Sequence, residues 1–173
     1  MFINLLKVCK LTLAPKYRWR VDDTHTVADY NNDKLFSTKG GSVVAVDADG
    51  DIISLCKNDG DLYFGSDILK VAVKNGGKKL DAYGDSLYEF YTKNGFRPIS
   101  WTPFNKEYAP HDWREDFGDN HHIIFYVYDP NYICTKTYEE FLQSVPCCKY
   151  NDGYEKARKI RDEYLLTMEN NNG

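Results

Sequence analysis

The stretch Phe90-Tyr91-Thr92-Lys93-Asn94-Gly95-Phe96 joins a helical pattern to a strand pattern. Before it, Lys79–Tyr83 reads as a strand, and Asp85–Asn94 has the spacing of a helix. Gly95 suits the end of that helix, because glycine adopts the left-handed conformation without a Cβ penalty. After it, Phe96–Thr102 reads as a second strand. Residues Leu80–Phe104 therefore predict a strand–helix–strand unit.

The clearest signal upstream of this unit is a β-hairpin. Ser42–Val46 and Asp51–Cys56 flank Asp49-Gly50, a dipeptide that supplies the positive φ angles of a two-residue turn. A helix is predicted from Ser66 to Asn75, because Ile68, Leu69, Ala72 and Val73 share one face and Gly76-Gly77 follows.

The rest of the chain carries weaker patterns. Pro98 indicates an edge position or a bulge in its strand, and residues 103–120 read as a polar, aromatic loop. The N-terminal segment 1–16 gives no clear element. The further elements predicted are a strand at Tyr17–Val21, a helix at Thr24–Tyr30, a strand at His121–Tyr128, and helices at Thr137–Ser144 and Gly153–Glu169.

This order, a hairpin followed by alternating helices and strands, predicts an α+β fold. We expect a mixed, mostly antiparallel sheet with helices on both faces. Residues 1–130 are expected to form this domain, and residues 131–173 a C-terminal helical extension on or near the core. The apolar stripe of the last helix either docks on its own core or forms a homodimer interface.

Composition limits the partners and the compartment. The 173 residues carry a net charge of −4, which disfavours nucleic acid because that partner needs a basic face. No run approaches the roughly 18 apolar residues of a membrane span, so no membrane is expected. Five cysteines without framework spacing are expected to be reduced and mostly buried, which favours a cytoplasmic protein.

The order of the predicted elements, with Tyr-x-x-x-Gly-Phe at residues 91–96, resembles the GNAT family of N-acyltransferases. Within that family, four stretches resemble small phage-encoded GNAT-like proteins. They are Gly40–Ser42, Gly50–Ser54, Gly76–Asp81 and Phe90–Phe104, which includes Tyr-x-x-x-Gly-Phe at the end of the helix. The resemblance covers residues 42–128 and implies acetyl-coenzyme A as cosubstrate. A phage origin would place the protein in the host cytoplasm.

The resemblance also implies where the cofactor lies. It assigns contacts to Leu55, Cys56 and Lys57 at the end of the hairpin, to Gly65, Ser66 and Asp67 at the helix start, and to Tyr91. The amides at a helix N-terminus favour an anion such as the pyrophosphate. The usual loop there is basic and glycine-rich, whereas residues 61–67 contain one glycine and no arginine. An ordinary helix start that Ser66 or Asp67 caps is the alternative.

Three residues are candidates for catalysis. The family tyrosine matches Tyr91, whose phenol can protonate the departing thiolate; packing with Phe90 and Phe96 is its alternative role. His111 and Asp81 are the two candidates for the base that deprotonates the acceptor. Cys56 is expected to be a buried strand thiol rather than a nucleophile.

The 103–120 loop indicates the acceptor. In GNAT proteins the connection between the last two strands helps to wall the acceptor site. Here it holds five carboxylates and favours a cationic primary amine, with a solvated acidic loop as the alternative. The carboxylates are those of Glu107, Asp112, Glu115, Asp116 and Asp119.

We expect no metal site. The acidic residues 47, 49 and 51 lack the glycine and glutamate positions of a calcium loop, and His121 and His122 would point to opposite faces of a strand. Two functions therefore remain open at this level. The first is a GNAT-type N-acetyltransferase in which the amine attacks the thioester directly. The second is an inactive GNAT-like module that binds a protein partner.

Overall fold

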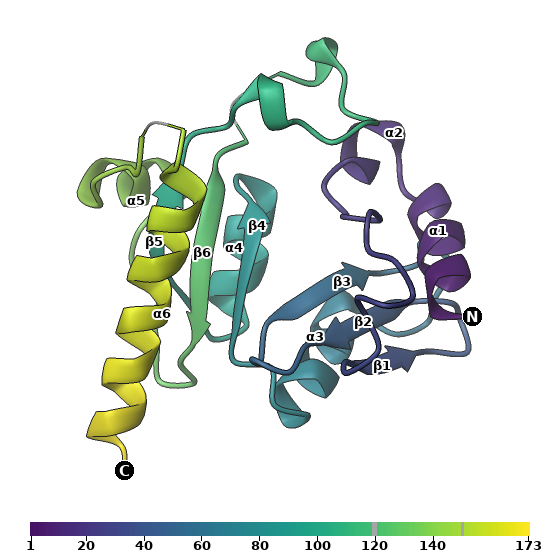
Figure 1. Cartoon of the computed structure of the whole chain (residues 1–173), viewed down its shortest axis with the longest axis horizontal. Coiled ribbons are helices and arrows are strands. Elements are labelled where there is room, and N and C mark those ends of the chain that lie inside the picture. The colour runs from purple at the N-terminus through teal and green to yellow at the C-terminus, as the bar shows by residue number, and fades with distance from the viewer. Residues whose placement is uncertain (119–120, 150) are drawn as a thin grey trace. The chain divides into compact units, whose positions relative to one another are not determined.

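The computed structural model describes residues 1–118, 121–149 and 151–173 (Figure 1). Asp119 and Asn120, from the end of the predicted loop, lie outside the described residues. The described residues form helices and two three-stranded antiparallel sheets, so the predicted α+β class is confirmed. The helices are α1 (Phe2–Thr12), α2 (Pro15–Arg18), α3 (Gly65–Lys74), α4 (Ser86–Lys93), α5 (Tyr138–Ser144) and α6 (Gly153–Asn171). The strands are β1 (Lys34–Ser37), β2 (Val43–Val46), β3 (Ile52–Cys56), β4 (Lys79–Tyr83), β5 (Phe96–Thr102) and β6 (Ile123–Tyr128).

The chain divides into two compact units. The first contains residues 1–78 together with 110–117, and the second contains residues 79–109 and 118–173. Each unit has one sheet and its own buried cluster. Residues 131–173, predicted as a helical extension, belong to the second unit.

The first unit is built on the sheet β1-β2-β3. Helices α1 and α3 both pack on β2 and β3, and all four residues of β2 are buried. Leu6 and Cys9 of α1 meet Val43 and Cys56 of the sheet in one core cluster. Because successive strand residues project to opposite faces, a strand buried along its whole length is covered on both sides.

The predicted hairpin is confirmed, but its turn is one residue longer than expected. Val46 pairs with Ile52, and the Asp47 amide donates to the Asp51 carbonyl, which leaves residues 48–50 as the loop. Gly50 has φ +85°, the left-handed conformation that ends a three-residue hairpin loop.

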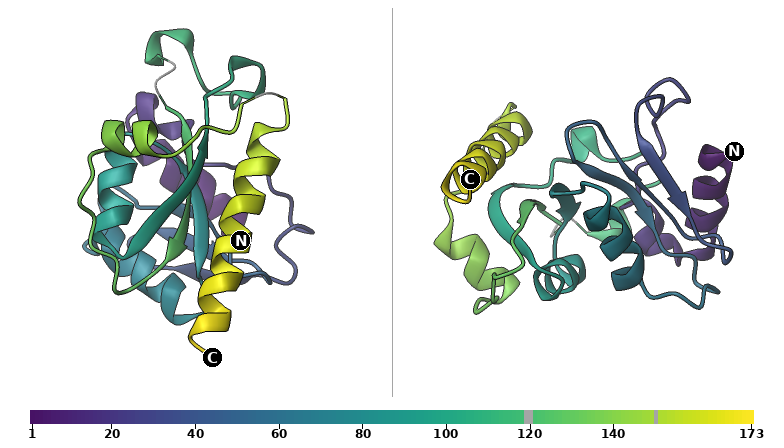
Figure 2. Two further views of the ribbon diagram at one scale, coloured as in Figure 1. Left: turned by 90° about the vertical axis from the view of Figure 1, so that its left-hand side faces the viewer. Right: turned by 90° about the horizontal axis from the view of Figure 1, so that it is seen from below.

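The second unit is built on the sheet β4-β6-β5, in which β6 pairs antiparallel with both neighbours. Helix α4 lies on one face of this sheet and α6 on the other (Figure 2). Adjacent residues of β6 show the division, since Tyr126 contacts Tyr91 of α4 and Phe125 contacts Tyr154 of α6. Pro98 lies on the edge strand β5, where the register shifts between Pro98 and Ser100. Both the edge position and the bulge are confirmed.

Most predicted elements of this unit are confirmed within one or two residues at their ends. The strands β4 and β5 have the predicted bounds, and α4 is followed by Gly95 with φ +84°. Thr137 caps α5, where its hydroxyl accepts from the Glu140 amide. Helix α6 begins at Gly153 and runs two residues beyond the predicted end.

The N-terminal predictions are wrong. The segment predicted as a strand at Tyr17–Val21 instead contains α2 and a turn, because Pro15 suits the first helical turn and the Trp19 indole donates to the Lys16 carbonyl. The segment predicted as a helix at Thr24–Tyr30 is irregular. There the Asp29 carboxylate accepts from both the amide and the hydroxyl of Thr26, which satisfies these groups without a helix. Helix α1 and strand β1 were not predicted.

Candidate functional site

Tyr91 packs one face of the second sheet from α4. Its ring lies 6.0 Å from that of Phe96 and 5.4 Å from that of Tyr126, between centroids, and 6% of the residue is exposed. Burial raises the pKa of Tyr91, and the charge of Asp81 adds to the rise, so the phenol is protonated at neutral pH. Within the described residues its hydroxyl has no hydrogen-bond partner. The Tyr91 ring therefore packs in the core, while its phenol proton is not given to any described acceptor.

Asp81 lies on the opposite face of the same sheet. It pairs with Phe125 across the strands, and cross-strand partners project to the same side, which here is the side of α6. The Tyr154 hydroxyl donates to both Asp81 carboxylate oxygens at 3.2 Å. An Arg161 guanidinium nitrogen lies 3.9 Å from the same carboxylate. The sheet thus separates Asp81 from Tyr91, and the structure does not bring these two predicted catalytic groups together.

The middle of β3 contains a strained backbone position of the first unit. Ser54 has φ +55°, and the pairing of β2 with β3 shifts register beside it. The Ser54 hydroxyl hydrogen-bonds the Tyr30 hydroxyl at 2.6 Å, which helps to hold this conformation. Bulges and positive-φ residues outside glycine cluster at functional sites. Leu55 lies in this bulge beside Ser54, and Cys56 follows it. The resemblance assigned both residues to the cofactor.

Cys56 and Lys57 both make contacts that stabilise the fold. The Cys9 thiol donates to the Cys56 carbonyl at 3.1 Å. Hydrogen bonding with the Cys9 side chain, together with burial, raises the pKa of the Cys56 thiol. A buried, protonated thiol agrees with the expected structural role. The Lys57 ammonium donates to the Asn58 carbonyl at 2.9 Å and to the Asp61 carbonyl at 3.4 Å. Lys57 therefore stabilises the turn that follows β3.

The start of α3 is capped by its own side chain. The Asp67 carboxylate accepts from the Phe64 amide at 2.9 Å, as the sequence alternative proposed. Within the described residues the next two amides, those of Gly65 and Ser66, have no hydrogen-bond partner. These two amides and the helix dipole remain suited to an anion. The Asp67 charge lies beside them and opposes it.

Sequence reasoning missed Asp61, which organises the turn. Its carboxylate accepts from the Thr38 and Ser42 hydroxyls and from the Tyr63 amide. The Ser42 hydroxyl in turn accepts from the Asn58 amide at 2.9 Å. These hydrogen bonds lower the pKa of Asp61 to about 2. An Asp whose carboxylate accepts from the amide two residues later is a local turn signal that a sequence can suggest. The Thr38 and Ser42 donors could not be predicted, because they come from another part of the chain.

Three consecutive apolar side chains in this turn face solvent. Leu62 is 95% exposed, Tyr63 is 55% exposed and Phe64 is 71% exposed. Because these three side chains are exposed, they do not contribute to the core. An exposed apolar group of this kind marks a surface for a partner or ligand. They occupy the positions where the resemblance implies a basic loop.

The 103–120 loop contributes residues to both units. His111 lies in the first unit, where its Nε2 is 3.2 Å from the Asp23 carboxylate. Asp112 forms an ion pair with Lys10 at 2.9 Å, and Arg114 forms one with Asp116 at 2.6 Å. Two of the carboxylates expected to attract a cationic acceptor therefore already form ion pairs within the chain.

The two adjacent histidines precede β6 rather than lying in it. His121 Nδ1 is 3.6 Å from an Asp85 oxygen, and His122 Nδ1 accepts from the Phe104 amide at 3.1 Å. Among the described residues, no group of three or more His, Cys, Asp or Glu side chains is arranged to hold a metal. In the same part of the chain, no helix has the length and apolar character needed to cross a bilayer.

Comparison of the chain with protein-family models, with curated proteins and with solved structures finds no match. The geometry described above is therefore the basis for the functional argument.

Proposed function

We propose that this chain is a GNAT-type acyltransferase that moves an acetyl group from acetyl-coenzyme A to a primary amine. The observation that carries the proposal is the bulge in β3, a strand that leads through a short turn to the open amides of Gly65 and Ser66. An edge strand with a bulge offers backbone groups to the amide-bearing arm of coenzyme A. The helix start offers amides to the pyrophosphate.

The order of elements supports the same proposal. Three antiparallel strands precede α3, and the strand–helix–strand unit that bears the family resemblance follows it. The strand β1, which was not predicted, supplies the first of these three strands, and β3 immediately precedes α3.

The proposed reaction needs one acid and one base. The amine nitrogen attacks the thioester carbonyl, the new N–C bond forms, the C–S bond breaks, and sulfur leaves as a thiolate. Tyr91 donates its proton to that thiolate, and its raised pKa keeps the proton on the phenol beforehand. Of the two base candidates, His111 has an exposed imidazole that Asp23 orients within the first unit, whereas Tyr91 belongs to the second unit. Asp81 is engaged by Tyr154 and Arg161 instead.

The proposed acceptor is a cationic amine, and the proposed setting is the cytoplasm. The exposed Glu107 carboxylate and the aromatic Tyr108 beside it favour a cationic amine at the loop. The net charge of −4 and the reduced cysteines suit a cytoplasmic enzyme without a nucleic-acid partner.

A second candidate function is a GNAT-like binding module without catalytic activity. The exposed Leu62, Tyr63 and Phe64 side chains favour it, because apolar groups that line a turn suit a protein surface better than a pyrophosphate. In this alternative the Asp67 carboxylate remains a helix cap, and the bulge in β3 is structural.

Thermal unfolding with and without acetyl-coenzyme A separates the two functions. A ligand at about a hundred times its Kd stabilises the folded state by about 2.7 kcal/mol, which raises Tm by roughly 5–10 °C for a chain of this size. We expect such a rise for the enzyme. An unchanged Tm at millimolar acetyl-coenzyme A would rule out the acyltransferase and leave the binding module.

Two substitutions test the assigned roles. Asp67→Asn keeps a capping oxygen but removes the charge beside the Gly65 and Ser66 amides, so we expect tighter acetyl-coenzyme A binding. Tyr91→Phe should reduce turnover of an amine acceptor while leaving cofactor affinity nearly unchanged. Tyr17→Phe, which removes a hydroxyl from a partly exposed ring on α2, is the matched control. Equal turnover in the two tyrosine variants would remove Tyr91 from the mechanism.

A further inference from the structure

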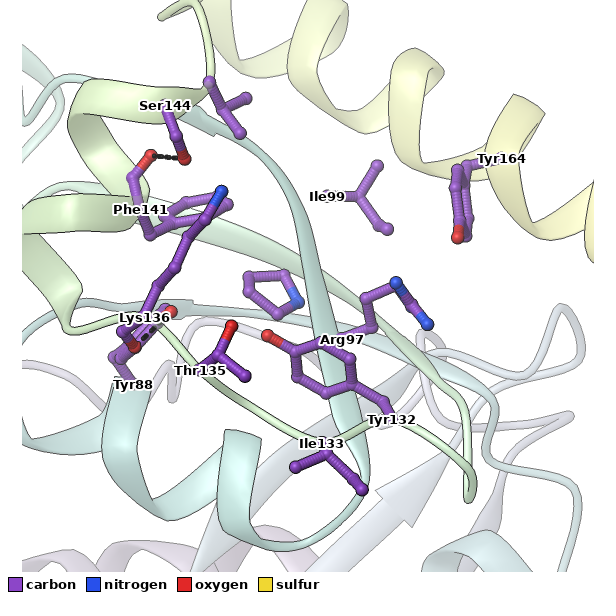
Figure 3. A pocket seen from close by; sticks show the side chains of 12 residues that line it. Tyr88, Arg97, Ile99, Tyr132, Ile133, Thr135, Lys136, Phe141, Ser144 and Tyr164 are labelled. Atoms are coloured by element: carbon purple, nitrogen blue, oxygen red, sulfur yellow. Dashed lines mark hydrogen bonds between the residues drawn. The ribbon is translucent and has the colours of Figure 1, made fainter.

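A cavity of about 490 Å³ opens in the second unit beside the edge strand β5 (Figure 3). Its walls come from β5, α4, α5, α6 and the segment that follows β6. The volume lies in the range of sites that hold small organic ligands, roughly 300–1,000 Å³. No residue of the cavity belongs to the first unit, so it is distinct from the turn before α3.

The floor of the cavity is rigid. Tyr88 and Phe141 are each 3% exposed, and their ring centroids are 5.7 Å apart. The Tyr88 hydroxyl donates to the Lys136 carbonyl at 3.2 Å, which ties the segment after β6 to α4. A site whose walls are fixed before binding loses little conformational freedom when a ligand enters.

One aromatic wall is held by a cation. The Arg97 guanidinium lies 4.7 Å from the Tyr132 ring centroid, and two of its nitrogens donate to one Asp129 oxygen at 2.8 and 3.0 Å. This arrangement fixes Tyr132 against β5. Figure 3 shows Ile99 and Tyr164 on the other side of the opening. Together they form flat apolar walls that suit a planar ring.

Lys136 supplies the cavity with a positive charge that is available to a ligand. Within the described residues its ammonium has no ion-pair or hydrogen-bond partner, although the chain as a whole is acidic. The residues that line the cavity include Arg97 and Lys136 but no carboxylate. The Arg97 charge is largely balanced by Asp129, so Lys136 supplies the attraction for an anion.

The edge of β5 disfavours an extended peptide as the occupant. Pro98 faces the cavity and has no amide hydrogen, and the register shift beside it bends the strand. These features blunt an edge against strand pairing. A compact ligand satisfies the walls without needing that edge.

We propose that this cavity binds a small planar aromatic anion, a carboxylate, sulfonate or phosphate carried on a ring system. The ring lies against Tyr132 and Ile99, and the acid group accepts hydrogen bonds from the Lys136 ammonium. The site is independent of the acyltransferase proposal, because the two share no residue.

Fluorescence titration of the full-length chain with anilinonaphthalene sulfonate tests the site. This probe is an aromatic anion with a planar naphthalene ring system, and its emission rises in apolar surroundings. We expect saturable binding of one molecule per chain. Lys136→Gln should weaken binding about tenfold, the effect of losing one charge-assisted hydrogen bond. Thr135→Trp, which places a bulky ring at the cavity wall, should abolish binding without unfolding the chain.

Matched controls keep the result specific. Lys93→Gln removes an exposed charge from α4 outside the cavity, and Leu62→Ser removes the most exposed apolar side chain of the α3 turn. Both should bind the probe as the wild type does. Phenylnaphthylamine, the uncharged analogue, should bind more weakly. The proposal fails if Lys136→Gln binds unchanged, if Leu62→Ser alone loses binding, or if the neutral analogue binds as tightly.

Discussion

At the scale of single residues, Asp61 shows how a surface carboxylate can set the shape of a turn. Three donors converge on it, the Ser42 and Thr38 hydroxyls and the Tyr63 amide, and they lower its pKa to about 2. A folded-state pKa below the unfolded value means that the ionised group stabilises the fold. That contribution is complete above the unfolded pKa and is lost as the pH falls through the folded one.

We therefore expect Asp61→Asn to lower Tm at pH 7, with the difference from wild type shrinking as the pH falls from about 4 to about 2. In that window the Asp61 carboxyl is protonated in the unfolded state but still ionised in the folded state. Thermal unfolding measured across this pH range tests the expectation. Asp59→Asn, two residues away on an exposed side chain, should change Tm little at any pH. A constant difference between Asp61→Asn and wild type would contradict the assigned cause.

Single residues also show the limit of sequence reasoning about the candidate site. The packing of Tyr91 with Phe90 and Phe96 was predictable, because all three lie in one short stretch. The position of Tyr91 and Asp81 on opposite faces of the sheet was not predictable, because it depends on which helix covers which face. That choice is made by contacts between residues far apart in the chain.

At the scale of elements, α6 is anchored to the sheet by a buried charge. The Arg161 side chain is 1% exposed, its guanidinium lies 5.6 Å from the Phe125 ring centroid, and it forms an ion pair with Asp162 at 2.9 Å. Its apolar neighbours on the same helix face are Ala157 and Leu165. In the sequence, Ile160 and Tyr164 recur at helical spacing with these two residues, yet they are 45% and 36% exposed. A hydrophobic pattern cannot predict an arginine at the centre of the buried face.

Removing that arginine should loosen α6. We expect Arg161→Ala to lower the free energy of unfolding by about 3 kcal/mol, because it removes a fully buried side chain together with its ion pairs to Asp162 and Asp81 and opens a cavity. Arg158→Ala, three residues earlier and partly exposed, should cost less than about 0.5 kcal/mol. Urea unfolding of the two variants provides the comparison. Similar losses in both would show that Arg161 is not an anchor.

Elements with strong local signals were predictable, and those that depend on distant partners were not. The β2–β3 hairpin, α3, α4 and β5 are bounded by glycine or by alternating residues. Helix α1 was missed because Lys7 and Lys10 interrupt its apolar residues. Lys10 is 5% exposed, and its ammonium lies between Asp23 and Asp112, which is over a hundred residues away in the chain. Tertiary ion pairs of this kind make a charged residue compatible with a buried helix face.

At the scale of the whole molecule, the chain folds as two units whose boundary is discontinuous in sequence. Residues 110–117 join the first unit, where the Lys10–Asp112 ion pair ties them to α1. Sequence reasoning divides a chain at composition changes, such as the one after residue 130. It has no signal for a short segment that returns to an earlier unit.

The five free cysteines can report on the two units separately. Cys9 and Cys56 are buried in the core of the first unit, Cys148 is buried in the second, and Cys134 and Cys147 are partly exposed. We expect a thiol reagent to modify Cys134 and Cys147 rapidly in the folded protein. The other three should react only through opening of their unit, at a rate that follows its local stability.

The positions of these cysteines allow the independence of the two cores to be tested. Because Arg161 anchors α6 within the second unit, we expect Arg161→Ala to accelerate modification of Cys148 and to leave Cys9 and Cys56 at their wild-type rates. Mass spectrometry of peptides after timed labelling resolves the three positions. Leu6→Ala, which opens a cavity beside Cys9, should produce the reverse pattern. Equal acceleration of all three thiols in either variant would instead mean that the chain opens as one cooperative body, with stability shared between the two sheets.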